Sequence, residues 1–208
     1  YFISKPFWPG QFQKEVILKS IDQESSIKLN LLKKDNIRLR EILSLQESSI
    51  NDTISAAVIS RKTGSWWRQI ILNKGSKDGV KIGSAVIGPG GLLGIVNNTS
   101  MFTSSVTLLT SPESKVGVWL DRIQINGLMV GLGDNYPSLI LYSKDADIKV
   151  GDFVSSSPAS TLLPPNIPIG IVQSINETFK AKKTAKISLL AKPHLIDWVK
   201  ILGVKVYE

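Results

Sequence analysis

The stretch from Gln11 to Ser49 contains neither glycine nor proline. Leucine, lysine, glutamine and glutamate, which are good helix formers, dominate it, so we predict one helix over residues 11–51. At a rise of about 1.5 Å per residue, the stretch from Gln11 to Ser49 alone would form a helix about 58 Å long. Apolar side chains on so long a rod need a partner, and this need constrains the fold more than any other feature of the sequence.

The second half of the predicted helix carries apolar residues at heptad spacing. Leu29, Asn36 and Leu43 fall at one core position of the heptad, and Leu32 and Leu39 fall at the other. A lone asparagine at such a position weakens a two-stranded coiled coil but fixes its register and strand number. We therefore predict dimerisation through these five residues; a helix packed on its own chain is the alternative.

The first half of the helix fits the heptad less well. Extending the register towards the N-terminus places Asp22 and Ser25 at core positions, so we expect fraying or a local break there.

Residues 1–10 are interpreted as a juxtamembrane arm. Five of the 15 aromatic residues of the chain lie among the first twelve residues, beside Lys5 and two prolines. Such a cluster is typical of the interface just outside a membrane helix, and this interpretation expects an apolar segment of about 20 residues before Tyr1. An arm packed on the folded domain is the alternative.

The hydrophobic pattern becomes strand-like after Asn51. Short runs rich in Val, Ile, Leu and Thr alternate with Gly, Pro, Asn and Asp clusters, as in antiparallel barrels. The predicted strands are 54–60, 66–73, 85–87, 92–97, 105–110, 116–121, 127–132, 138–143, 152–156, 169–175, 185–190 and 199–206. The predicted fold class is mainly β: a coiled-coil helix and two six-stranded antiparallel barrels, at 52–136 and 137–208, with a hinge at Asp134–Pro137.

Residues 70–96 include seven glycines, a density that raises the question of a phosphate-binding loop. A dinucleotide fingerprint needs glycine at the first, third and sixth positions of a strand-to-helix turn, but Leu93 occupies the sixth. The sequence also lacks the Gly-Lys-Ser/Thr triplet of a P-loop. The glycines instead suit hairpin turns at Asn73–Gly75, Lys77–Gly79 and Gly88–Gly91, where we expect positive φ angles.

Few kinds of active site can be built from this sequence, which lacks cysteine and has a single histidine, His194. Thiolate metal sites and a cysteine nucleophile are excluded. Asp197 is near enough in sequence to orient His194, but a loop histidine is the simpler interpretation, and Asp145 and Asp147 suit a solvated turn. We therefore predict no catalytic residue, no cofactor and no metal site.

The net charge of +8 is uneven, because residues 171–208 hold seven basic and three acidic side chains. The basic segment Lys180–Lys186 either attracts polyanions or forms a solvated hairpin tip. Nucleic-acid binding needs aromatic residues interleaved with the lysines, and only Phe179 lies beside this segment. We therefore expect no nucleic-acid partner, and keep a polyanion- or nucleic-acid-binding β-barrel protein as the alternative function.

Trp66 and Trp67 are adjacent, and successive residues of a strand point to opposite faces. One indole is expected inside a barrel and the other outside, where tryptophan is typical of protein interfaces. These two residues are our candidates for contact with another protomer or a protein partner; the alternative is that the neighbouring barrel or the helix end covers the outer ring.

A series of short motifs runs through the β region. They are Ser65-Trp66-Trp67-Arg68, Lys74-Gly75-Ser76, Asp78-Gly79-Val80, Gly91-Leu92, Leu108-Leu109-Thr110, Val116-Gly117-Val118, Gly151-Asp152 and Pro168-Ile169-Gly170-Ile171-Val172. Together these motifs resemble the bacterial rod shape-determining MreC family. One departure is a loop, where Ser156–Ser160 and Pro165–Ile167 replace a Ser-Gly-rich turn and a Pro-x-Gly of that family.

The resemblance implies a non-enzymatic scaffold of the cell-wall elongation machinery that maintains cell shape. Members of that family are anchored in the inner (plasma) membrane by a single helix and face the periplasm or extracytoplasmic space. They form dimers or filaments, dock a penicillin-binding transpeptidase, and act with MreD and MreB-associated machinery. In that family the first strand after the helix can complete the later barrel, so the strand 54–60 is expected in either barrel.

Overall fold

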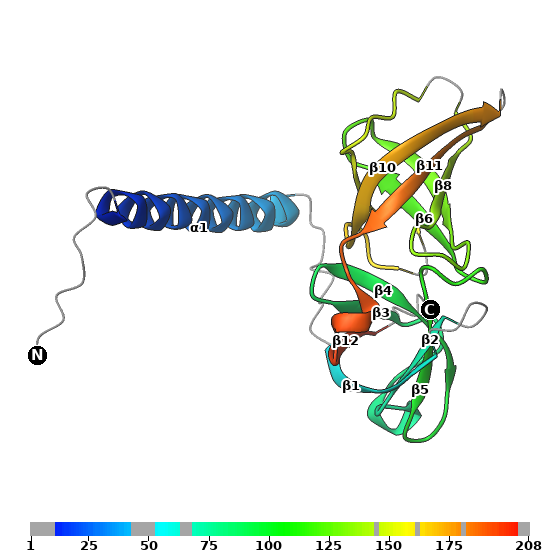
Figure 1. Cartoon of the computed structure of the whole chain (residues 1–208). Coiled ribbons are helices and arrows are strands. Elements are labelled where there is room, and N and C mark those ends of the chain that lie inside the picture. The colour runs from blue at the N-terminus through cyan, green and yellow to red at the C-terminus, as the bar shows by residue number, and fades with distance from the viewer. Residues whose placement is uncertain are drawn as a thin grey trace, which may run out of the picture. The chain divides into compact units, whose positions relative to one another are not determined.

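The computed structural model describes residues 11–42, 53–62, 68–143, 146–160, 163–179 and 182–203. The chain divides into two compact units, Tyr1–Ser49 and Ile50–Glu208. The first unit contains the helix α1, and the second contains the twelve described strands (Figure 1).

The helix α1 spans Gln11–Ile42 without a break. The break expected near Asp22 and Ser25 is therefore wrong. Both residues are exposed, and a polar side chain in water costs an isolated helix little, whatever its place in a heptad. The predicted extension of the helix to residue 51 lies outside the described residues.

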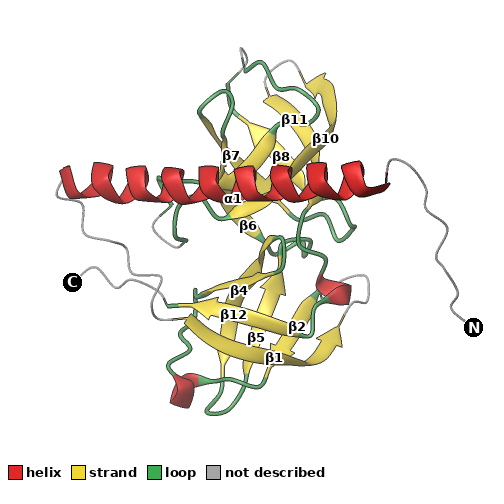
Figure 2. Ribbon diagram, turned by 90° about the vertical axis from the view of Figure 1, so that its left-hand side faces the viewer, coloured by secondary structure: helices red, strands yellow, loops and turns green. Residues whose placement is uncertain are grey.

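The twelve described strands form two closed antiparallel barrels of six strands each (Figure 2), as predicted. The first barrel runs β1 (Thr53–Lys62), β12 (Trp198–Leu202), β3 (Ala85–Gly88), β4 (Gly91–Thr99), β5 (Ser104–Leu108) and β2 (Gln69–Leu72). The second runs β10 (Pro168–Phe179), β11 (Lys182–Leu189), β8 (Ser138–Leu141), β7 (Ile125–Val130), β6 (Lys115–Leu120) and β9 (Phe153–Ser156). Two short 3-10 helices, η1 (Ser76–Asp78) and η2 (Pro193–Leu195), lie in connections.

The first barrel takes its sixth strand from the far end of the chain. Its strands β1 to β5 come from residues 53–108, and five strands leave this barrel open. The strand β12 fills the gap between β1 and β3, with Thr53 opposite Leu202. The alternative in which the strand 54–60 joins the second barrel is therefore wrong, since β1 pairs with β12 and β2.

The second barrel is contiguous in sequence, from β6 to β11. The predicted boundary between residues 136 and 137 is wrong, because it separates β7 from β8, which pair through Met129 and Leu139. The turn residues Asp134–Pro137 connect two strands of one barrel and are no hinge. Turn chemistry marks a hairpin as readily as a domain boundary, so the local sequence does not distinguish the two.

Each barrel has an apolar interior, because side chains alternate between its inside and its outside along every strand. In the first barrel Val86 lies opposite Ile201, and both are fully buried inside. One residue further along, Ala85 and Leu202 belong to the outer face, yet they are buried because they pack into the apolar cluster of the second barrel. We call this contact the inter-barrel seam.

The turn between β3 and β4 closely approaches the backbone of the second barrel at the seam. A Cβ atom on Gly91 would lie 2.1 Å from Pro168 O, and one on Gly90 would lie 2.6 Å from Leu190 O. Gly90 and Gly91 also have positive φ angles, 96° and 135°. The prediction that the glycine-rich stretch forms turns is confirmed, and only glycine lets the two barrels approach this closely here.

Two other predicted turn glycines, Gly75 and Gly79, differ in their φ angles. Gly79 has the expected positive φ angle, 88°. Gly75 has an extended φ angle of −134°, so the expectation of a positive value there is wrong.

Candidate interaction surfaces

Two of the predicted dimerisation residues, Leu29 and Leu32, are each 58% exposed on α1. Asn36 and Leu39 lie further along the same helix, and Leu43 lies outside the described residues.

Further exposed apolar residues extend this face of α1 towards its N-terminus. At about 100° per residue, all of them fall within about 120° of arc. We call this set the helix stripe: Ile17, Leu18, Ile21, Leu29 and Leu32. Two other exposed apolar residues, Val16 and Ile27, fall on the other side of the helix, and Leu31 lies about 40° beyond Ile17 at the edge of the stripe. An apolar stripe on an exposed helix favours a helical partner, and the dimer itself stays a prediction.

The predicted partner contacts Trp66 and Trp67 lie outside the described residues, and the strand β2 that follows them begins at Gln69. Their role stays a prediction. The described part of the first barrel presents another tryptophan, Trp198 on β12, which is 66% exposed. Sequence reasoning missed Trp198 because the last strand was predicted to begin only at the next residue.

His194 and Asp197 are not joined in a catalytic arrangement. His194 lies in η2, and Asp197 Oδ1 accepts a hydrogen bond of 2.7 Å from Arg61 Nη2. The same Arg61 nitrogen donates to Ile196 O at 2.7 Å. Asp197 and Arg61 therefore tie the segment before β12 to β1.

Asp147 is also engaged in ion pairs, at 3.4 Å from Arg122 Nη1 and 3.3 Å from Lys149 Nζ. Asp145 lies outside the described residues. Across the described ranges, no group of three or more His, Cys, Asp or Glu side chains is placed to hold a metal ion. In the same part of the chain, no helix combines the length and apolar character that a membrane crossing needs.

The buried carboxylate of Asp152 anchors the turn before β9. Its side chain is 5% exposed, and its two oxygens accept hydrogen bonds from Arg122, Nε to Oδ1 at 2.5 Å and Nη2 to Oδ2 at 2.9 Å. Lys149 N donates to Asp152 Oδ2 at 2.8 Å. The hydrogen bonds from Arg122 hold the pKa of Asp152 below its usual value, and Asp152 in turn raises the pKa of Arg122. This pair explains why the Gly151-Asp152 motif carries an aspartate.

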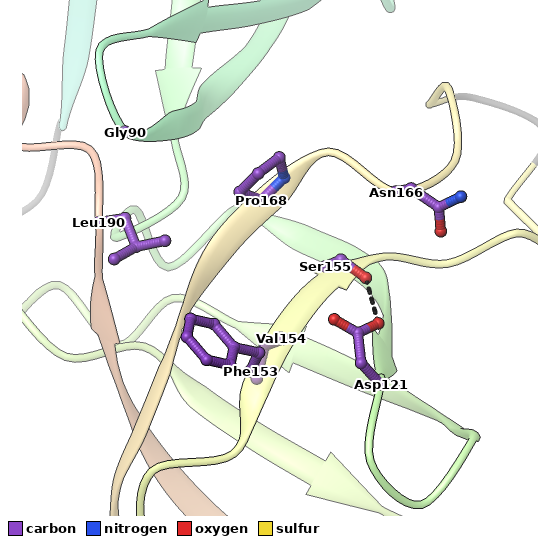
Figure 3. Close-up of a pocket in the computed structure, with 8 residues that line it drawn as sticks. All are labelled: Gly90, Asp121, Phe153, Val154, Ser155, Asn166, Pro168 and Leu190. Atoms are coloured by element: carbon purple, nitrogen blue, oxygen red, sulfur yellow. Dashed lines mark hydrogen bonds between the residues drawn. The ribbon is translucent and has the colours of Figure 1, made fainter. Parts of the chain in front are cut away.

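A pocket of about 500 Å³ opens on the outer face of the second barrel, beside the inter-barrel seam (Figure 3). Its lining comes from five chain segments: Gly90, Asp121, the β9 residues Phe153, Val154 and Ser155, the neighbouring Asn166 and Pro168, and Leu190. Because Gly90 belongs to the turn that touches the second barrel, the packing of the two barrels shapes the pocket wall.

The two ends of the pocket differ in chemistry. Figure 3 shows Phe153 and Leu190 towards one end, and Asp121, Ser155 and Asn166 towards the other. Phe153 is 58% exposed and Leu190 is 38% exposed. Ser155 Oγ donates a hydrogen bond of 3.0 Å to Asp121 Oδ1. The pocket therefore suits a group that is apolar along its length and polar at its tip.

Serine hydroxyls hold the loop in which the sequence departs from the resembled family. Ser156 Oγ donates to Pro164 O at 2.6 Å and accepts from Ile167 N at 2.8 Å. These bonds close the loop just before Asn166, which has a positive φ angle of 62°. Asparagine adopts this left-handed conformation more readily than most residues. The loop thereby places Asn166 at the pocket.

The basic segment Lys180–Lys186 lies in the hairpin of β10 and β11, and its residues Lys182–Lys186 belong to β11. Lys180 and Ala181, where the predicted hairpin tip falls, lie outside the described residues. Lys183 Nζ donates to Ala146 O at 2.8 Å, so this lysine binds its own barrel. The lysine that lies over an aromatic ring in the described chain is Lys77, 5.5 Å from Phe102, and it belongs to the first barrel.

Two joined closed β-barrels, preceded by a helix with an exposed apolar stripe, define a class of double-barrel protein. The family described as "Rod shape-determining protein MreC, barrel core" matches residues 58–203. The chain therefore belongs to the MreC family.

Individual relatives agree with this assignment. The cell shape-determining protein MreC of Listeria monocytogenes is 34% identical over 151 residues, which cover 69% of this chain and 51% of the relative. This chain thus spans about half the length of that relative. A solved structure of MreC from Listeria monocytogenes has a TM-score of 0.79 at 29% identity, over 96% of this chain and 97% of the other.

A third comparison concerns a solved complex between Penicillin-Binding Protein (PBP2) and MreC from Helicobacter pylori. It matches with a TM-score of 0.61 over 74% of this chain and 98% of the other. At 17% identity, this likeness shows a common fold.

Proposed function

We propose that this chain is a non-enzymatic scaffold of the bacterial cell-wall elongation machinery and helps to maintain cell shape. Membership of the MreC family supports the role in cell shape. The observation that carries the scaffold proposal is the helix stripe, because an exposed apolar helix face serves association and has no use in catalysis.

In this proposal the chain forms a homodimer, or a filament, through the helix stripe and its continuation at Asn36, Leu39 and Leu43. An inner-membrane helix ahead of Tyr1 anchors it, and the barrels face the periplasm or extracytoplasmic space. The aromatic cluster of residues 1–10 supports the anchor.

The barrels dock a penicillin-binding transpeptidase, and MreD and MreB-associated machinery act at or across the membrane. The Helicobacter pylori complex supports the transpeptidase, since it contains an MreC protein of the same fold. Both barrels are closed, so a partner binds to side chains on their outer faces. Trp66 and Trp67 are the proposed contacts.

A charge-insertion experiment tests self-association. Replacing Leu29 and Leu32 together with lysine places charges in the helix stripe, and sedimentation should then report a monomer where the unmodified chain is a dimer. The matched control replaces Val16 and Ile27 with lysine. These residues are about as exposed but lie on the other side of α1, so the control should remain dimeric.

The β-type circular dichroism should be the same in all three proteins, because the barrels form a separate compact unit. An unchanged mass in the stripe variant would show that the helix is not the dimer contact. Equal dissociation of both lysine variants would show that the face of the helix does not matter.

A further inference from the structure

The pocket beside the inter-barrel seam carries a carboxylate that has no cationic partner in the described part of the chain. Asp121 follows β6, and its Oδ1 accepts a hydrogen bond from the hydroxyl of Ser155. The neighbouring Arg122 does not neutralise Asp121, because its guanidinium binds Asp152 and Asp147. Asp121 is therefore available to a cation from outside the chain.

Strand pairing brings this carboxylate and an aromatic ring to one face of the barrel. Leu120 pairs with Val154, and both are buried inside the second barrel. The next residues, Asp121 and Phe153, therefore belong to the outer face, and Asp121 N donates to Phe153 O at 3.4 Å. Residues opposite each other in this way have Cβ atoms about 5 Å apart, so one ligand side chain can contact both.

The chemistry of the pocket selects a basic side chain. Phe153, Leu190 and Pro168 provide an apolar surface for an aliphatic stem, and Asp121 provides a negative charge beyond it. An arginine matches this arrangement better than a lysine. Its planar guanidinium stacks on an aromatic ring and donates two hydrogen bonds to one carboxylate.

We propose that this pocket binds an arginine side chain on an extended segment of a partner protein. The stem lies on Phe153 and Leu190, and the guanidinium binds the carboxylate of Asp121, with the side-chain oxygen of Asn166 as a further acceptor. This site is separate from the helix stripe and goes beyond the proposed self-association. Because Asn166 belongs to the loop that departs from the family pattern, we expect the selectivity of the pocket to be a property of this chain.

The barrel unit of a second copy of this chain does not supply the arginine. The unit Ile50–Glu208 contains three arginines, and each is bonded within its own chain. Arg61 binds Asp197 at 2.7 Å, Arg68 binds Gly133 O and Asn135 Oδ1 at 3.1 Å each, and Arg122 binds Asp152. A second copy therefore has no free arginine to offer from its barrels.

The test is an NMR titration of the isotope-labelled chain with the blocked peptide Gly-Leu-Arg-Leu-Gly. The comparison peptide carries citrulline, which has the shape of arginine without its charge. We expect the arginine peptide to shift the amide signals of Asp121, Phe153, Asn166 and Leu190. We also expect the citrulline peptide to bind at least about tenfold more weakly, and added salt to weaken only the arginine peptide.

Two matched pairs of variants locate the site. Asp121→Asn should weaken the arginine peptide about tenfold, whereas Glu113→Gln, an exposed residue before the opposite end of β6, should leave it unchanged. Phe153→Ser should weaken both peptides, whereas Phe102→Ser, which removes a ring of nearly equal exposure (59%) from the first barrel, should weaken neither.

Equal binding of the two peptides, or equal effects of Asp121→Asn and Glu113→Gln, would overturn the proposal. So would self-association that Asp121→Asn abolishes, since the occupant would then be a second copy. The variant with Leu29 and Leu32 changed to lysine keeps the pocket, and it should bind the arginine peptide like the unmodified chain. The experiments can therefore contradict the proposed arginine pocket and the proposed helix dimer independently of each other.

Discussion

Ala57 on β1 lies opposite Trp198 on β12, although the whole second barrel separates the two residues in sequence. The first barrel therefore closes only when the end of the chain returns to its beginning. Contacts between residues so far apart in sequence require a large loss of chain entropy before their favourable interactions form. We therefore expect β12 to contribute as much to the stability of the first barrel as its other strands, β1 to β5, do.

Replacing Ile201 with alanine tests this dependence. Ile201 is fully buried inside the first barrel, so the change should lower the free energy of unfolding by about 2–5 kcal/mol. Lys200→Ala, next to it on the exposed face of β12, should change that free energy by less than about 0.5 kcal/mol. Urea unfolding measures both, and similar values would mean that β12 is not integral to the barrel.

The close approach of the two barrels predicts unequal effects at two glycines of positive φ. Gly151→Ala should cost only the backbone strain of about 1–2 kcal/mol, because nothing lies within 4 Å of a Cβ atom there. Gly91→Ala should cost clearly more, because its Cβ atom would lie 2.1 Å from Pro168 O. Thermal unfolding of both variants gives the comparison. Equal losses of stability in the two variants would mean that the inter-barrel seam accommodates the added methyl group without a measurable cost.

The pair of Arg122 and Asp152 predicts a dependence of stability on pH. Arg122 lowers the pKa of Asp152 in the folded chain from its ordinary value of 3.8. The pair therefore stabilises the fold above about pH 4, and this stabilisation is lost as the pH falls through the lowered pKa.

Asp152→Asn should accordingly lower the urea midpoint at neutral pH and flatten its fall in acid. Glu113→Gln, which removes an exposed carboxylate, should leave both the midpoint and its acid dependence nearly unchanged. The outcome that contradicts this prediction is an acid dependence of Asp152→Asn as steep as that of the unmodified chain.

Alanine substitution of Trp66 and of Trp67, one at a time, tests the proposed partner contact. If one ring fills a barrel and the other faces outward, the inner change should cost about 3–5 kcal/mol of stability. The outer change should leave unfolding nearly unaltered and weaken self-association or capture of the transpeptidase. Two equally destabilised variants with normal binding would show that both rings are core.

The sequence by itself determined the elements that depend on local interactions. The helix follows from residues of high helix propensity without glycine or proline, and α1 runs unbroken even where Asp22 and Ser25 interrupt the heptad. The twelve strands follow from short runs of β-formers between turn residues, and Gly79, Gly90 and Gly91 occupy turns where turns were predicted. Family membership could also be predicted from the sequence, because each family motif is a short run of consecutive residues.

Only the tertiary structure decided which strands share a barrel and which side chains share a site. A strand pattern shows that one face is buried but not against which strand it packs. The sequence therefore predicted the strand β12 but not its place in the first barrel, and it wrongly divided the barrels between residues 136 and 137. Nothing in the local sequence distinguishes Asp121 from Asp152. In the structure the carboxylate of Asp152 is paired with Arg122, whereas the carboxylate of Asp121 lines the pocket. The physical reason is that burial, ion pairing and the shape of a pocket arise from groups that packing brings together from distant segments.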